Sequence, residues 1–496
     1  MSPVNPVSLP NHATLDRMRR EAKLLQRAVR AGDPQALRLL TRHGSAADAG
    51  PDFQLTRAQL VVARAHGFAS WPRLKRYFDT AADLRFEPAP AQDVEAVGDR
   101  FLRLACLGYT PDDGSDRWTA ARALLAEHPG LSAQDVWVAA AAGDHVTVTE
   151  RLTADPGLAR RRGGVFRWTP LYYVGYSRVA DPTVAEAIAR RLLAAGADPD
   201  EGYLWAGQPT PFTLVTGALG SGEMGSVRQP ALPVSFARML LEAGADPNDG
   251  QALYNRQFEP DDSHLRLLFE YGLGEGDGGP WRQLLGDVLD DPAGLLRDQL
   301  SWAVDHDMVD RVALLIERHI DLTVPDRHGH RPVEAALLSG NQQIAEMLLA
   351  AGAPAPVLSP ADRLIAAVMA GDRPTADQVA ADHPGAHAEA LRFRPGLPVW
   401  AASRGRSGAV ALALDLGWSL DVLGRGDTTV EQPWQTALHE AAGNGSREIV
   451  GLLLARGADR TIRDRRFHVT AADWARYFDH SDIAALIDGF EPRDAG

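Results

Sequence analysis

The chain has 496 residues with 45% hydrophobic and 23% charged side chains, and its formal net charge is −14. This composition is typical of a folded protein, and no apolar run approaches the ~18 residues that a membrane-spanning helix needs. A single cysteine, Cys106, excludes an internal disulfide and lies in an apolar run, where core packing is its expected role.

The first 85 residues (1–85) are predicted to form a basic helical lead-in and cap. Residues 1–80 hold 13 basic and 6 acidic residues, whereas the rest of the chain has a net charge of −21. An acidic array favours basic or neutral partners, so nucleic acid is not expected along its length. The start of the sequence lacks the basic and then apolar pattern of a signal peptide, which predicts a cytoplasmic protein without a membrane segment.

Residues 53–79, FQLTRAQLVVARAHGFASWPRLKRYFD, are predicted to form two short helices around a turn at Gly67. Such a pair is also the outline of a DNA-binding helix-turn-helix, in which Arg73 and the basic residues after it could reach phosphates. Against that alternative, Arg73 stands where such a motif requires an apolar residue. The aromatic side chains of Phe68 and Trp71 favour packing of this segment onto the first helix pairs.

Residues 86–356 are predicted to form a degenerate array of helix pairs with insertions. Similar endings mark the exits of these pairs: LLAAGADPD at 192–200, LLEAGADPN at 240–248 and LLAAGAP at 348–354. Helix starts with a threonine cap and a following proline are predicted at Thr169, Pro170, Leu171 and again at Thr210, Pro211. The insertions are long loops at 217–233 and 274–280, and such loops are either functional or mobile.

The most regular unit is QTALHEAAGNGSREIVGLLLARGADRTIRD, from Gln435 to Asp464. Thr436 is suited to cap its first helix, and Leu438 belongs to the apolar face of that helix. Gly457 suits the left-handed residue that ends the second helix. His439 lacks the second histidine of a zinc-protease motif, so a structural role is expected for it.

The residue types and spacing of this unit resemble one nearly complete ankyrin repeat. The resemblance implies an all-α, ankyrin-type helical-repeat solenoid with short hairpin-like turns between repeats. Ending glycines lie from 48 residues (196 to 244) to 108 residues (244 to 352) apart, against a repeat period of about 33, so degenerate units must fill the gaps and roughly eleven units are predicted. Residues 357–490 are assigned to the C-terminal repeats and a terminal cap, and residues 491–496 to a disordered tail.

The lead-in supports the same resemblance. Its residues Ala63 to Lys75 follow the pattern ARxxGFxSWPxLK, which resembles a segment found ahead of ankyrin arrays in some bacterial proteins. The arginine and alanine bias of the chain also resembles proteins of GC-rich bacteria.

Ankyrin repeats bind partners against their inner helices and at the tips of the turns between repeats, so the resemblance implies a binding surface there. Tyr, Trp and Arg side chains most often carry binding energy. The tip residues predicted to contact a partner are Asp200, Tyr203, Trp205, Asp249, Arg327, His328, His330, Arg425, Asp427, Arg463, Arg465 and Arg466.

The leading hypothesis is a non-catalytic ankyrin-repeat scaffold that binds another protein, with no cofactor, no metal and a monomeric state. One alternative is a DNA-associated regulator that uses residues 53–79. A second alternative is an enzyme with a site in the long insertions. No catalytic residues are predicted, because the chain lacks a nucleophile elbow, paired zinc cysteines and a lysine after any glycine-rich run.

Overall fold

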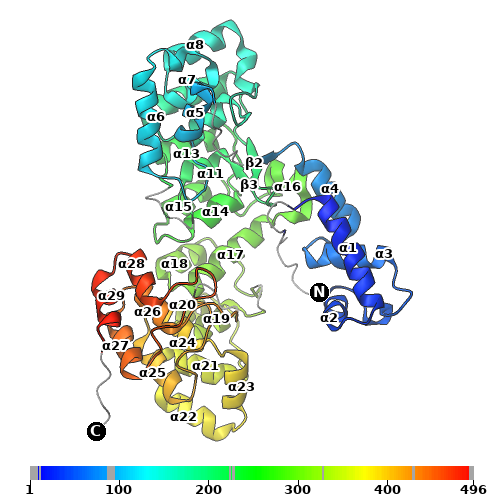
Figure 1. Cartoon of the computed structure of the whole chain (residues 1–496), viewed down its shortest axis with the longest axis vertical. Helices are drawn as coiled ribbons and strands as arrows, with labels where there is room; N and C mark the ends of the chain where they lie inside the picture. Colours follow the sequence, from blue (N-terminus) through cyan, green and yellow to red (C-terminus); the bar gives the residue numbers. More distant parts are fainter. Residues whose placement is uncertain are drawn as a thin grey trace. The chain divides into compact units, whose positions relative to one another are not determined.

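A computed structural model of the chain describes Leu9 and residues 13–86, 95–222, 225, 229–326, 329–426 and 431–490. The described part is mostly helical, as predicted (Figure 1), and it divides into two compact units, Met1–Leu296 and Arg297–Gly496. The predicted boundaries after residues 85 and 356 stay predictions. The tail predicted at 491–496 lies outside the described residues.

The first unit begins with four helices that share one apolar core. They are α1 (Leu15–Arg30), α2 (Pro34–His43), α3 (Leu55–Ala65) and α4 (Trp71–Ala81). The Ser70 hydroxyl caps α4, and Gly67 has a φ of 86°, which the turn between α3 and α4 requires. Phe68 is buried in the core of these helices and Trp71 packs against it.

Helix α4 of the helix-turn-helix alternative packs against other parts of the same unit. The Tyr77 hydroxyl donates a hydrogen bond to the carbonyl of Gly207 at 2.9 Å, and α4 contacts α16 (Gly279–Leu285). Arg73, which that alternative would aim at phosphates, pairs with Asp287. These contacts favour the packing interpretation of residues 53–79.

Paired helices follow, each short and antiparallel to its neighbour. They are α5 (Val97–Ala105), α6 (Ser115–Glu127), α7 (Val136–Ala142), α8 (His145–Ala154), α9 (Pro170–Tyr176), α10 (Pro182–Ala194), α11 (Leu214–Leu219), α13 (Val234–Glu242), α14 (Gly250–Arg256) and α15 (Ser263–Glu270). The first helices of successive pairs stack, α7 on α9, α9 on α11 and α11 on α14. Short 3-10 turns lie at Ala46–Asp48, Leu131–Ala133, Pro156–Arg160 and Gly286–Val288.

A small three-stranded sheet, which the sequence analysis did not predict, lies in the first unit. Strand β2 (Gly202–Trp205) pairs in parallel with β1 (Arg85–Phe86) and antiparallel with β3 (Pro211–Thr213). The helix start predicted at Thr210 and Pro211 is therefore wrong. Pro211 belongs to β3, and the Thr213 side chain accepts the first N–H groups of α11. Thr169 does cap α9, with Pro170 in the first turn.

The second unit begins within α17 (Pro292–Asp305) and continues as stacked helix pairs. The helices are α18 (Val309–Glu317), α19 (Pro332–Leu338), α20 (Gln342–Ala350), α21 (Pro360–Ala370), α22 (Arg373–Asp382), α23 (Ala386–Phe393), α24 (Leu397–Ser403), α25 (Ser407–Asp415), α26 (Ala437–Gly443), α27 (Arg447–Ala455), α28 (Ala471–Tyr477) and α29 (Ser481–Asp488). Helix α26 contacts α24 on one side and α28 on the other, and α27 likewise contacts α25 and α29. One apolar core runs through these pairs, from Leu338 to Ile487.

The regular unit at 435–464 has the local chemistry that its residues predict. The Thr436 hydroxyl lies 2.8 Å from Nδ1 of His439, and the other ring nitrogen lies 3.2 Å from the carbonyl of Val469 in the next unit. His439 is buried, and burial lowers the pKa of its imidazole. Gly457 has a φ of 86° directly after α27. His439 therefore joins two successive helix pairs within the second unit, which is a structural role.

Candidate partner-binding surface

Two of the predicted tip residues, Tyr203 and Trp205, are buried, so their assignment to an exposed surface is wrong. They lie in β2, the middle strand of the small sheet, with only 4% and 6% of their surface exposed. The Tyr203 hydroxyl donates to Glu201, and Trp205 Nε1 donates to the carbonyl of Gly108 at 2.9 Å. The preference of Tyr and Trp for interfaces applies equally to a protein interior, because both bury a large apolar ring.

Both side chains belong to an aromatic cluster that forms the centre of the first unit. Its members pack in tilted, edge-to-face and stacked pairs, with ring centroids 4.3 to 6.5 Å apart. The members are Phe86, Tyr109, Phe166, Trp168, Tyr172, Tyr173, Tyr176, Tyr203, Trp205 and Phe212. The cluster thereby packs the three-stranded sheet against helix α9.

Asp249 is also buried, and its predicted contact with a partner is wrong. Its carboxylate caps α14 by accepting the N–H of Ala252 at 2.9 Å, and it accepts the hydroxyls of Thr213 and Thr216. An N-cap aspartate that also receives two hydroxyl groups is satisfied within the fold. Asp200 is partly buried, and its carboxylate accepts the N–H of Asp246 at 2.7 Å. Burial raises the pKa of Asp200 to about 6.

The predicted arginines near the C-terminal end are exposed or partly exposed, and two of them, Arg425 and Arg466, lie over aromatic rings. The guanidinium carbons of Arg425 and Arg466 lie 5.1 and 5.0 Å from the ring centre of Trp434. Arg466 also lies over the ring of Phe467, at 5.2 Å. With their neighbours these residues form the tip cluster: Arg425, Trp434, Arg463, Arg465, Arg466 and Phe467.

Backbone contacts fix the two turns that carry the tip cluster. Gly424 pairs with Gln435 across the first turn, and Arg463 pairs with Thr470 across the second. The N–H of Arg465 donates to the carbonyl of Trp434 at 2.9 Å, which joins the two turns. The sequence analysis missed Trp434 and Phe467. Their positions in the sequence could have identified them as tip residues, because Trp434 directly precedes the unit at 435–464 and Phe467 lies in the turn that follows it.

The segment that connects these two turns is similar to a known repeat. Residues 434–465 match the family model for the ankyrin repeat. A comparison with curated proteins found no match. The matched residues include Thr436, His439 and Gly457, whose contacts are described above, together with Trp434 and two arginines of the tip cluster.

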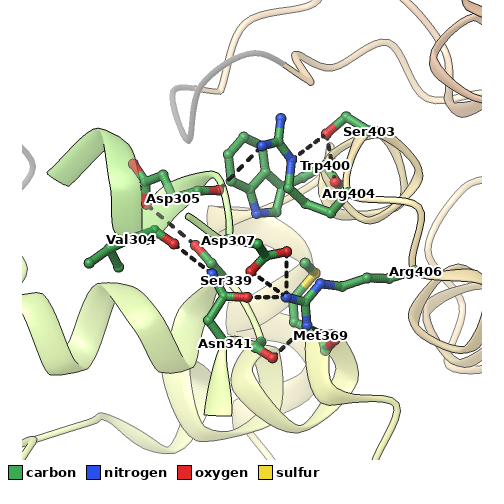
Figure 2. Close-up of polar contacts among 11 residues, drawn as sticks. Val304, Asp305, Asp307, Ser339, Asn341, Met369, Trp400, Ser403, Arg404 and Arg406 are labelled. Carbon is green, nitrogen blue, oxygen red and sulfur yellow. Dashed lines mark hydrogen bonds and ion pairs between the residues drawn. The ribbon is translucent and has the colours of Figure 1, made fainter. Parts of the chain in front are cut away.

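Arg406, which follows α24, bonds residues at the ends of three other helices of the second unit (Figure 2). Its guanidinium pairs with the carboxylate of Asp307 at 2.9 Å and also bonds the Asn341 side chain. It donates to the carbonyl of Gly340 at 2.5 Å and to that of Met369 at 3.4 Å. Asp307 follows α17, Gly340 and Asn341 follow α19, and Met369 lies in the last turn of α21. Arg406 therefore ties the ends of these inner helices to the end of α24.

Next to these contacts, the side chain of Arg404 lies between Trp400 of α24 and Asp305, the last residue of α17 (Figure 2). Its guanidinium lies 4.6 Å from the ring centre of the buried Trp400, and it donates to the carbonyls of Asp305 and Gly426. The ring of His306 lies edge-on to Trp400 at 6.3 Å. A partner cannot occupy these positions, because the chain's own side chains already do.

The carboxyl of Asp305, which lies beside Arg404, predicts that the stability of the fold depends on pH. Burial and the nearby Asp326 raise its pKa to about 7, although Arg394 and Arg404 oppose the rise. Because the folded state then holds a proton that the unfolded chain releases near pH 4, stability falls as the pH rises from about 4 through 7.

We therefore expect the Asp305→Asn variant to match the natural protein in stability only below about pH 4, and its advantage in unfolding free energy to grow by about 3 kcal/mol between pH 5 and pH 8. Urea unfolding at a series of pH values measures the difference. A constant difference across this range would show that Asp305 is ionised in the folded protein throughout.

The other predicted tip residues have separate outcomes. His330 is partly exposed, and its N–H donates to the carboxylate of Asp326 at 2.9 Å. Arg327, His328 and Asp427 lie outside the described residues. Within the described ranges, none of the helices combines the length and apolar character that crossing a bilayer requires.

Proposed function

We propose that this chain is a non-catalytic, cytoplasmic ankyrin-repeat scaffold that binds another protein through the tip cluster of its C-terminal repeats. In this proposal the stacked helix pairs of both units are degenerate ankyrin-type repeats. The observation that carries the proposal is the match of residues 434–465 to the ankyrin-repeat model, together with three exposed arginines at the end of the match and directly after it, at 463, 465 and 466.

The inner face supports the choice of the tips over the inner helices. Where Arg404 and Arg406 join the ends of α17, α19, α21 and α24, that face is already occupied. The turn at 463–470 is held in shape by its own hydrogen bonds, so a partner can bind it without first ordering it, which lowers the entropic cost of binding.

Site-specific photo-crosslinking on the full chain tests the proposal. A photoreactive residue replaces Phe467 in one variant and Phe393 of α23 in a matched control, since both side chains are about half exposed, at 58% and 52%. We expect a discrete protein to crosslink at position 467 and not at 393, and to bind the natural chain at a one-to-one ratio after purification. Equal crosslinking at both positions would reject the tip cluster as the binding surface.

A further inference from the structure

The tip cluster concentrates positive charge in an otherwise acidic unit. The second unit, from Arg297 to the end of the chain, has 20 arginines, no lysine and 28 acidic residues. Four of those arginines, Arg425, Arg463, Arg465 and Arg466, lie in the two joined turns (424–435 and 463–470), which hold three acidic residues and are therefore net positive by one charge. Such a local reversal of sign attracts a group of opposite charge and of limited size.

The acidic residue within the second turn does not neutralise these arginines. Asp464 is buried, with 1% of its surface exposed. Its carboxylate accepts the N–H groups of Arg466 and Phe467 at 2.8 and 2.6 Å, and also Trp474 Nε1 at 3.2 Å. Burial raises the pKa of Asp464, but these hydrogen bonds outweigh it and hold the pKa below its usual value. Asp464 therefore shapes the turn from inside, while its neighbours Arg463, Arg465 and Arg466 are exposed.

Arg465 and Arg466 are the arginines best placed to meet an anion. Both are exposed, and among the described residues no carboxylate lies within ion-pair distance of either guanidinium. The guanidinium groups of Arg466 and Arg425 both lie over the ring of Trp434. An arginine stacked on an aromatic ring keeps its edge free for a bidentate contact with a carboxylate.

We propose that the tip cluster binds a short acidic segment of a partner protein, with adjacent Asp or Glu side chains on Arg465 and Arg466. The exposed ring of Phe467 offers an apolar contact beside them. A duplex nucleic acid is disfavoured, because its charge continues past the cluster and meets the acidic remainder of the unit. This inference rests on the proposed scaffold function and names the chemistry of its partner.

Fluorescence anisotropy with defined probes tests the inference on the full chain. The probes are a short labelled peptide with a run of glutamates, the same peptide with glutamines, the same peptide with phosphoserines, and a short DNA duplex. We expect the glutamate peptide to bind and the glutamine peptide not to bind, and the binding to weaken with salt.

The decisive variant is Arg465→Glu/Arg466→Glu, which should weaken binding of the glutamate peptide by about tenfold or more. Its matched control is Arg373→Glu/Arg447→Glu, which changes the net charge equally at two other exposed arginines and should leave most of the binding. Equal loss in both variants, or tighter binding of the duplex or of the phosphoserine peptide, would overturn the inference. Unchanged circular dichroism and thermal unfolding show that both variants are folded.

The two proposals fail in different ways. If a protein crosslinks at position 467 but the glutamate peptide does not bind, the scaffold function stands and the acidic partner is wrong. If position 467 crosslinks no better than position 393, the scaffold proposal falls at this surface, whatever the peptides do.

Discussion

Replacing Trp168 by alanine is expected to destabilise the first unit by about 3 to 5 kcal/mol. Trp168 is fully buried at the centre of the aromatic cluster. Its ring centroid lies 4.6 Å from that of Phe166 and 4.7 Å from that of Tyr172, and it also packs against Phe86 of β1 and Trp205 of β2. These rings come from different elements, so the cavity left by alanine cannot close without moving a strand or a helix.

Hydrogen exchange read by mass spectrometry measures this effect where it arises, because a chain of two units need not unfold in one step. We expect faster exchange in α9 and in β2, and little change in the second unit. The matched control is Trp137→Ala, since Trp137 is only partly buried and donates its Nε1 to the carbonyl of Arg161. Equal destabilisation by both variants would contradict a central role for Trp168.

The aromatic cluster shows why part of the fold could not be predicted from the sequence. Phe86 and Trp205 are far apart in the chain, yet their strands pair and their rings lie 4.5 Å apart. Periodicity within a window reveals amphipathic helices but carries no information on such distant pairing. Residues 202–205 therefore read as an exposed turn rich in interface residues, and the strand that buries them went unpredicted.

The helix pairs themselves could be predicted from the sequence where a glycine follows the second helix. Gly196, Gly244, Gly352 and Gly457 all adopt the left-handed conformation, with φ between 86° and 101°. At the corresponding end of α18, His319 takes the same conformation with a φ of 56°. A search for glycine endings cannot find such a position, because a side chain is tolerated there when the surrounding structure fixes the turn.

The tip cluster shows the limit of prediction for the candidate site. The charge and the turn position of Arg463, Arg465 and Arg466 can be read from the sequence, because they directly follow the ending of the regular unit. The contact of Arg425 and Arg466 with one tryptophan ring cannot, because it needs two turns from successive units to lie side by side. Their role in binding stays a prediction until a partner is bound.

Replacing Arg406 by alanine is expected to destabilise the second unit by about 2 to 4 kcal/mol. The guanidinium bonds Asp307, Gly340, Asn341 and Met369, which lie at the ends of three helices, α17, α19 and α21, and only 21% of its side chain is exposed. Without it, the carbonyls of the buried Met369 and the partly buried Gly340 lose a charged donor that water cannot fully replace, whereas the Asp307 carboxylate is partly exposed. Arg406→Lys should recover less than half of the loss, because one ammonium group cannot reach four acceptors in different directions.

The matched control is Arg447→Ala, because Arg447 pairs with Asp482 on the surface, where both side chains are more than 60% exposed. That change should cost less than about 1 kcal/mol. Urea unfolding gives both values, and hydrogen exchange should show faster exchange in the Arg406→Ala variant at the turns after α17 and α19. If the two variants are equally stable, Arg406 does not hold the inner helices together. In that case the inner face can open, and the argument that directs a partner to the tips loses its support.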